Sequence, residues 1–75
     1  MNRVERDEVL ARLANDIEEL MVSQKFSIAK LARRADVSAA TIHNILHARP
    51  CHVDKLMAIL TVLGARFDYV LHRDT

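Results

Sequence analysis

The segment that most constrains the fold is SIAKLARRADVSAATIHNIL, at residues 27–46. Its order of apolar and polar positions predicts two short helices joined by a tight turn, which is a helix-turn-helix pattern. The side chains expected to face inward, from the first helix through the turn to the second, are Leu31, Ala32, Val37, Ile42 and Ile45. The positions between and around them are small or polar, and they include Ser38, Thr41, His43 and Asn44. We expect the chain to fold around this helix pair and to leave one face of the second helix open.

The sequence on either side predicts two longer helices. Residues 3–23 have apolar side chains at spacings of three and four, which form one stripe on a helix: Val9, Leu13, Ile17, Leu20 and Met21. Residues 52–63 repeat the spacing with Leu56, Ile59, Leu60 and Leu63. Gly64 then stands just past the last turn, where a left-handed residue usually ends a helix.

The two short helices have their own boundary signals. Ser27 and Ser38 are suitable N-caps for helices at residues 28–35 and 39–47. Asp36 stands where the chain must reverse, and aspartate is among the better substitutes for glycine in the left-handed conformation. These signals predict a mainly α fold of four or five helices.

Size and composition indicate one small globular domain. The 75 residues include 51% hydrophobic and 28% charged residues, which is typical of a folded chain. The opening MNRVERDEV lacks the apolar core of a secretory signal, and no apolar run approaches the roughly 20 residues that cross a bilayer. A single cysteine cannot form an internal disulfide. We therefore expect a cytoplasmic protein with no membrane partner.

The net charge of +1 conceals an uneven distribution. Residues 1–24 contain three arginines and six acidic residues, whereas residues 25–55 contain six lysines or arginines and two acidic residues. The remaining residues contain two of each sign. The positive segment coincides with the helix pair, as a surface that faces DNA phosphates requires, although the same cations could simply keep a helix soluble. With the helix-turn-helix pattern present, double-stranded DNA is the leading candidate partner.

The C-terminal residues change from a helical to an alternating pattern. Phe67, Tyr69 and Leu71 alternate with other side chains, which predicts a β-strand at residues 65–72. A single strand needs a partner for its backbone groups, and the same strand from a second copy would supply one. The expected dimer contacts are Phe67, Tyr69, Val70 and Leu71. The alternative is a short fifth helix. The chain would thus be one domain with a helical extension at 1–12, a core at 13–64 and a dimerisation strand at 65–72.

Taken together, residues 13–64 resemble the Cro/repressor-type, or XRE, family of helix-turn-helix domains. The resemblance rests on the order and spacing of Leu13 and Ile17, Phe26-Ser27, Leu31-Ala32, Val37-Ser38, Thr41-Ile42 with Ile45, and Leu63-Gly64. It implies a lambda-repressor-like fold in which the helix at 39–47 enters the major groove of DNA. The tail is similar to that of members whose C-terminal strand builds a homodimer, including antitoxins of toxin–antitoxin pairs.

The resemblance also implies roles for individual residues. Base contacts are expected from Ala39, Ala40, His43 and Asn44, among which the Asn44 amide suits adenine N6 and N7. Contacts to the DNA backbone are expected from Ser27, Lys30, Arg33, Arg34, Ser38, Thr41, His47 and Arg49. The chain departs from the family pattern at Ile28, where glutamine is common, and at Asp36 and Ala48, where glycine is common. These departures leave the expected DNA-facing surface poor in hydrogen-bond donors.

Other classes of function have weaker support in the sequence. His43, His47, Cys51 and His52 raise the alternative of a metal site, because the first two lie one turn apart on a helix. There is no CxxC pair, and surface histidines beside a basic helix account for the same residues, so we expect no metal and no cofactor. A lone cysteine near histidines also suggests thiol catalysis, but no glycine-rich phosphate loop or oxyanion-hole motif accompanies it, so we expect no enzyme.

The stronger alternative is an antitoxin that binds both its promoter and a protein toxin. The candidate surface for binding a toxin is the acidic side of the helix from Glu5 to Glu19. The simpler interpretation is that these acidic side chains only keep the helix solvated. We expect a homodimeric, nucleoid-associated regulator that binds a palindromic operator and blocks or recruits polymerase.

Overall fold

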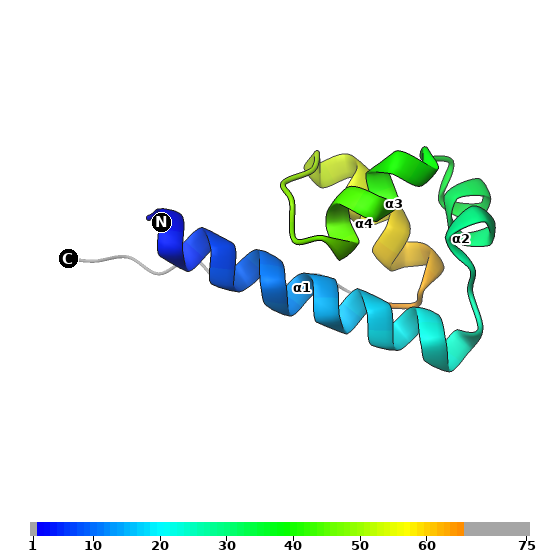
Figure 1. Cartoon of the computed structure of the whole chain (residues 1–75). Coiled ribbons are helices and arrows are strands. Elements are labelled where there is room, and N and C mark those ends of the chain that lie inside the picture. Colours follow the sequence, from blue (N-terminus) through cyan, green and yellow to red (C-terminus); the bar gives the residue numbers. More distant parts are fainter. Residues whose placement is uncertain (1, 66–75) are drawn as a thin grey trace.

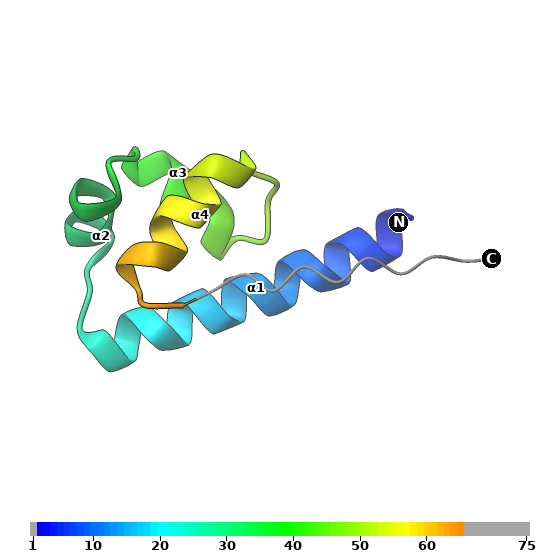
Figure 2. The ribbon, with the colours of Figure 1, turned by 180° about the vertical axis from the view of Figure 1, so that it is seen from behind.

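The computed structural model describes residues 2–65, which form four helices. They are α1 (Arg3–Gln24), α2 (Ile28–Ala35), α3 (Ala39–Leu46) and α4 (Val53–Val62). Figures 1 and 2 show α1 as a long rod, with the three short helices packed together against its C-terminal half. The predicted helices are confirmed to within one residue at each end. The described residues contain no strand, and the predicted dimer residues Phe67, Tyr69, Val70 and Leu71 lie outside them.

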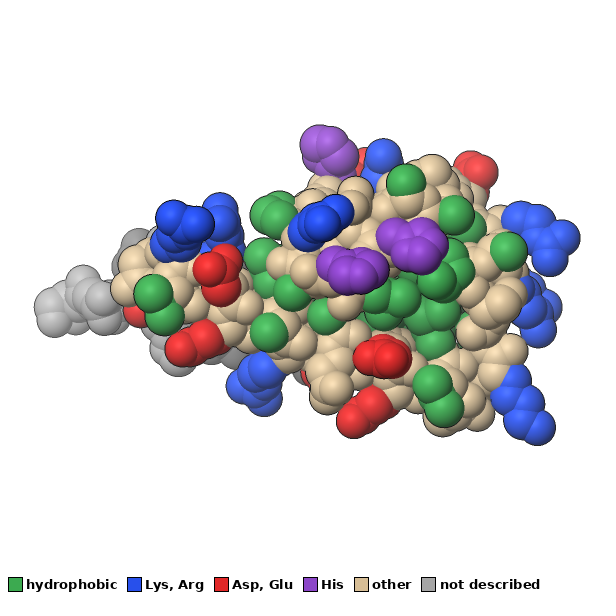
Figure 3. Space-filling model, viewed as in Figure 1, with side chains coloured by type: hydrophobic (Ala, Val, Ile, Leu, Met, Phe, Trp, Pro, Cys, Tyr) green, Lys and Arg blue, Asp and Glu red, His purple; other side chains and the backbone are tan. Residues whose placement is uncertain are grey.

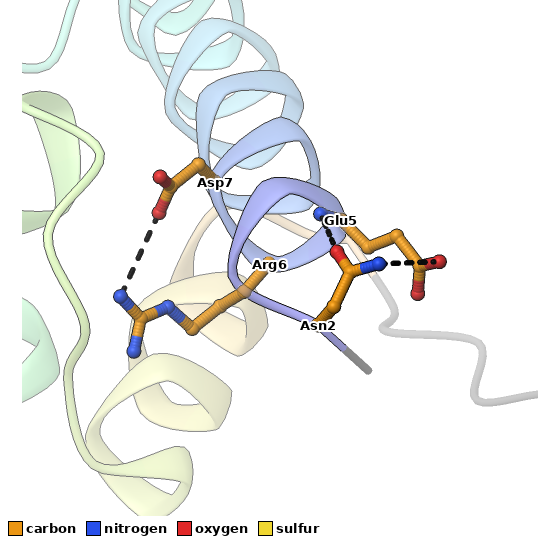
Figure 4. Close-up of polar contacts among 4 residues, drawn as sticks. All are labelled: Asn2, Glu5, Arg6 and Asp7. Carbon is orange, nitrogen blue, oxygen red and sulfur yellow. Dashed lines mark hydrogen bonds and ion pairs between the residues drawn. The ribbon is translucent and has the colours of Figure 1, made fainter.

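Three of the four helices begin with a side-chain cap. The hydroxyls of Ser27 and Ser38 accept hydrogen bonds from the backbone N–H groups of Lys30 and Thr41, both at 3.1 Å, which confirms the predicted caps. At the start of α1, Asn2 Oδ1 accepts from the Glu5 N–H at 2.9 Å (Figure 4). Asn2 Nδ2 in turn donates to Glu5 Oε1 at 3.4 Å, and this second contact between the two side chains holds the capping asparagine in place.

All four helices end in the same way, with one residue in the left-handed region. These residues are Lys25, Asp36, Ala48 and Gly64, with φ values of 59°, 56°, 58° and 73°. After each of them, the next N–H bonds back to a carbonyl five residues earlier; Val37 to Ala32 at 3.0 Å is one example. The left-handed conformation predicted for Asp36 and Gly64 is confirmed. Only Gly64 adopts it without a steric cost, so the other three stops are held by the packing around them.

Each helix contributes one fully buried aliphatic side chain to a common core. These side chains are Ile17, Leu31, Ile42 and Ile59, and each is at most 1% exposed. Burying a side chain of this size stabilises the fold by about 1.5–3 kcal/mol. The end of α4 is also tied to the end of α1, where Gln24 Nε2 donates to the Leu63 carbonyl at 2.6 Å. The core therefore holds α3 in a fixed orientation with respect to the other three helices.

The N-terminal half of α1 differs from the rest of the molecule. Its first turns extend past the other helices in both views, and the buried residues of α1 begin only at Ala14 (Figures 1 and 2). Val9, the first residue of the predicted stripe, lies with Leu13 on the side of α1 that faces Ile45 and Leu56, although its side chain is 44% exposed. Near this end, Arg6 and Asp7 form an ion pair at 3.7 Å on the surface (Figure 4). No helix within residues 2–65 has the length and apolar character needed to cross a membrane.

Candidate nucleic-acid interface

The second helix of the predicted pair, α3, is held by its buried side. Ile42 and Ile45 are 1% and 3% exposed, and they belong to the same core as Leu31 and Ala35 of α2. The turn between the helices is closed by Asp36, and Val37 packs against the core directly after it. Since both ends of the turn are fixed by packing, α3 presents a constant face to the outside.

The exposed face of α3 carries no charged side chain. Ala39, Ala40, His43 and His47 are exposed, and Asn44 is half-buried beside them. The His43 and His47 rings stack with centroids 6.3 Å apart and an angle of 22° between their planes. His47 Nδ1 lies 2.8 Å from the His43 carbonyl oxygen, and this contact fixes the outer ring on the helix. Figure 3 shows histidine side chains gathered over this part of the surface.

Beside this neutral face, α2 exposes a cluster of cations, which we call the α2 cations: Lys30, Arg33 and Arg34. Lys30 Nζ and the Arg34 guanidinium lie 5.2 Å and 5.9 Å from the centre of the Phe26 ring, so a cation–π contact positions both of them. Within residues 2–65, none of the three forms an ion pair with a carboxylate. Lysine and arginine side chains are visible along the edge of the molecule where α2 lies (Figure 3). Their charge is therefore available to an anionic partner.

The turn after α3 brings Arg49 back over the end of the helix. Ala48 adopts the left-handed conformation, and the Arg49 N–H then donates to the Asn44 carbonyl at 2.8 Å. The guanidinium of Arg49 also approaches the Asn44 side chain, with Nη1 donating to Oδ1 at 3.4 Å. Sequence reasoning placed Arg49 among the backbone contacts and missed this pairing. The sequence signal that could have indicated this pairing is Ala48, which stands where the family usually has the glycine that reverses the chain after the helix.

A shallow hollow of about 370 Å³ lies between α3 and the start of α4. Its lining is Thr41, Asn44, Pro50, Cys51, His52 and Lys55. Burial raises the pKa of the Cys51 thiol, and the nearby Lys55 ammonium partly offsets the rise. A thiol that stays protonated at neutral pH is a poor nucleophile. No group of three histidine, cysteine or acidic side chains that could hold a metal occurs in the described part of the chain.

The structure separates the predicted backbone contacts into two groups. Those with exposed side chains are Ser27, Lys30, Arg33, Arg34, Ser38, His47 and Arg49. Thr41 differs from them, because it is 9% exposed and its Oγ1 shares a 2.9 Å hydrogen bond with Ser38 Oγ. Its side chain stabilises the start of α3 and also lines the hollow next to Asn44, so its contact with the DNA backbone stays a prediction.

Comparison with known proteins places this geometry in a family. No curated protein sequence matches the chain. A family model described as a Cro/C1-type HTH DNA-binding domain matches residues 16–71. The matched region contains α2, α3, α4 and the part of α1 that packs on them, and it covers well over half of the chain. The chain belongs to the family of Cro/C1-type helix-turn-helix DNA-binding domains.

Proposed function

We propose that this protein is a sequence-specific transcriptional regulator that binds a palindromic operator as a homodimer. The observation that carries the proposal is the neutral face of α3 lying beside the α2 cations, on a domain of a DNA-binding family. DNA needs both kinds of surface, since phosphates attract cations in any sequence while base edges are read by small and polar groups. Regulation would follow from occupancy, because a protein bound at a promoter blocks or recruits polymerase.

In this proposal α3 lies in the major groove and supplies the base contacts. Asn44 is the side chain with both a donor and an acceptor for base edges, and His43 adds a ring nitrogen. Ala39 and Ala40 offer only methyl groups, which suit the C5 methyl of thymine. The α2 cations, Arg49, His47 and the hydroxyls of Ser27 and Ser38 would contact the sugar–phosphate backbone and set the position of α3 in the groove.

The homodimer follows from how little of the operator one copy can read. One eight-residue helix with few polar side chains covers only a short half-site, so two copies are needed for useful selectivity. The proposed contact between copies is the segment at 65–72, with Phe67, Tyr69, Val70 and Leu71. A two-fold dimer would place two α3 helices in successive major grooves, about 34–36 Å apart.

The proposal is tested by selecting bound duplexes from a random DNA pool at near-physiological salt. The expected result is an enriched palindrome whose half-sites lie about 10 base pairs apart, bound by two copies per duplex in light scattering. Enrichment of no motif, with binding lost as salt rises, would show phosphate contact alone and would contradict sequence-specific regulation.

A second candidate function is that of an antitoxin, in which the same protein also holds a toxin. The observation that favours it is the acidic surface of α1, where Glu5, Glu8, Asp16, Glu18 and Glu19 are all exposed. Co-expression with the product of the adjacent gene tests it. A complex that survives purification and is lost in Glu18→Lys with Glu19→Lys would support an antitoxin, whereas no complex, or one unaffected by these changes, would count against this surface.

A further inference from the structure

We propose, on the basis of the DNA-binding function proposed above, that Asn44 and Arg49 act as one unit that reads a G·C base pair. Arg49 would then be a specificity-determining residue as well as a cation near the backbone. The pairing differs from the role that Asn44 would have alone, in which its amide suits adenine. Three features of the structure lead to guanine instead.

The first feature is the backbone, which places the two side chains together. Ala48 turns the chain into the left-handed region at φ 58°, and this reversal lets the Arg49 N–H reach the Asn44 carbonyl at 2.8 Å. A backbone hydrogen bond between two residues brings their Cα atoms, and so the bases of their side chains, close together. The Arg49 side chain therefore begins beside Asn44 whatever rotamer it adopts.

The second feature is the orientation that Arg49 imposes on the Asn44 amide. A guanidinium has only donors, so the group that faces it must be the amide oxygen, and Nη1 lies 3.4 Å from Oδ1. The amide nitrogen, Nδ2, then points away from Arg49. Because Asn44 is half-buried, the amide has limited freedom to turn away from this arrangement.

The third feature is the set of hydrogen-bond groups that the pair leaves for DNA. Nδ2 of Asn44 and the remaining N–H groups of Arg49 are donors, and the Asn44 Oδ1 atom keeps one lone pair as the single remaining acceptor. Guanine presents two acceptors, N7 and O6, in the major groove, whereas adenine presents one acceptor and the N6 amino donor. An adenine amino group that donated to this lone pair would share Oδ1 with the guanidinium and would lie beside its N–H groups, where two donors repel each other. The pair therefore matches guanine better than adenine.

The surrounding charge brings the pair close to DNA. Among residues 2–65, Arg49 makes no ion pair, so its positive charge is not neutralised by a carboxylate. Lys55 and His52 line the same hollow as Asn44, and Lys55 adds a further positive charge there. These charges attract any duplex, whereas the arrangement of donors in the pair selects guanine.

The test repeats the random-pool selection with Asn44→Ala, Arg49→Ala, the double variant and the matched control Arg33→Ala. We expect the wild-type half-site to contain a G·C pair whose preference falls by roughly tenfold in each single variant, the size of one good base contact. The double variant should lose little more than either single one, because the two side chains act together. Arg33→Ala should keep the G·C preference while its affinity falls for all duplexes. Circular dichroism confirms that each variant is folded.

Two results would contradict the paired reading of guanine while leaving the proposed function in place. One is that the base pair whose selection is lost in Asn44→Ala proves to be A·T in the enriched motif. The other is an Arg49→Ala variant that binds all duplexes equally less well and keeps the preference, which would make Arg49 a phosphate contact only. A pool with no enriched motif for the wild type would instead contradict sequence-specific regulation, and the pair with it.

Discussion

The helices α2 and α3 have the same length and bury three residues each, yet their exposed faces are opposites. The outer face of α2 carries three cations and no acid, while that of α3 carries alanines, two histidines and one amide. Cations attract phosphates whatever the DNA sequence, so we expect α2 to contribute affinity that depends on salt. A neutral face gains little from phosphates and depends on matching base edges, so we expect α3 to contribute selectivity. In our proposal the two parts of DNA recognition therefore belong to different helices.

The largest expected effect comes from breaking the core that both helices share. Ile42→Ala removes a side chain that is 1% exposed and should lower the free energy of unfolding by about 2–5 kcal/mol. The apparent affinity for every duplex should then fall in proportion to the folded fraction, because only the folded domain presents both helices. Urea denaturation measures the change, and His43→Ala on the exposed face of the same helix is the control, with a change below about 0.5 kcal/mol. Equal stability of the two variants would show that Ile42 does not anchor α3.

Next in size is the removal of charge from α2. Arg33→Ala combined with Arg34→Ala removes two proposed phosphate contacts and should make the slope of log affinity against log salt shallower by about two. At 0.15 M salt this corresponds to roughly 30-fold weaker binding to every duplex. Fluorescence anisotropy with the selected and a scrambled duplex measures both slopes. If the double variant lost affinity for the selected duplex alone, α2 would be reading the base sequence, which would contradict its proposed role.

A smaller change is expected from the neutral face. Asn44→Ala should weaken binding to the selected duplex by roughly tenfold and leave binding to a scrambled duplex unchanged, because it removes a base contact and no charge. Competition between the two duplexes measures the difference directly. Equal weakening on both duplexes would remove Asn44 from base reading.

The smallest effect concerns the turns that position the two helices. Ala48→Gly should raise the free energy of unfolding by about 0.5–1 kcal/mol, since alanine at φ 58° carries a steric cost that glycine avoids. Asp36→Gly, at φ 56°, should gain less, because aspartate tolerates the left-handed region better than alanine. Thermal unfolding compares them. Base preference should be unchanged in both, and a changed preference would mean that the turns do more than end the helices.

Much of the fold could be predicted from the sequence, because its signals are local. Helix ends follow from Ser27, Ser38 and Gly64, whose capping and left-handed preferences act within one turn of the chain. The four fully buried side chains were all among the predicted inward positions, since helical spacing alone determines which face is apolar.

The details that the sequence could not supply depend on tertiary packing. Periodicity extends the apolar stripe of α1 to Val9, but the packing over Val9 is incomplete and leaves its side chain 44% exposed. The sequence does not reveal that Thr41 is only 9% exposed or that its hydroxyl is engaged with Ser38. The approach of Arg49 to Asn44 depends on the backbone after α3, for which the sequence offered an alanine in place of the expected glycine. In the candidate site, residue types were predictable and their partners were not.

The most direct test of the division between α2 and α3 is a salt titration of wild-type affinity for the selected duplex and for a scrambled one, above neutral pH. If α2 supplies affinity and α3 supplies selectivity, both affinities fall with salt along nearly parallel lines, with slopes differing by less than about 0.9, the weight of one phosphate contact. Lines that converge as salt rises, until the two duplexes bind alike, would show that the discrimination is itself electrostatic. That result would contradict the separate roles of the two helices.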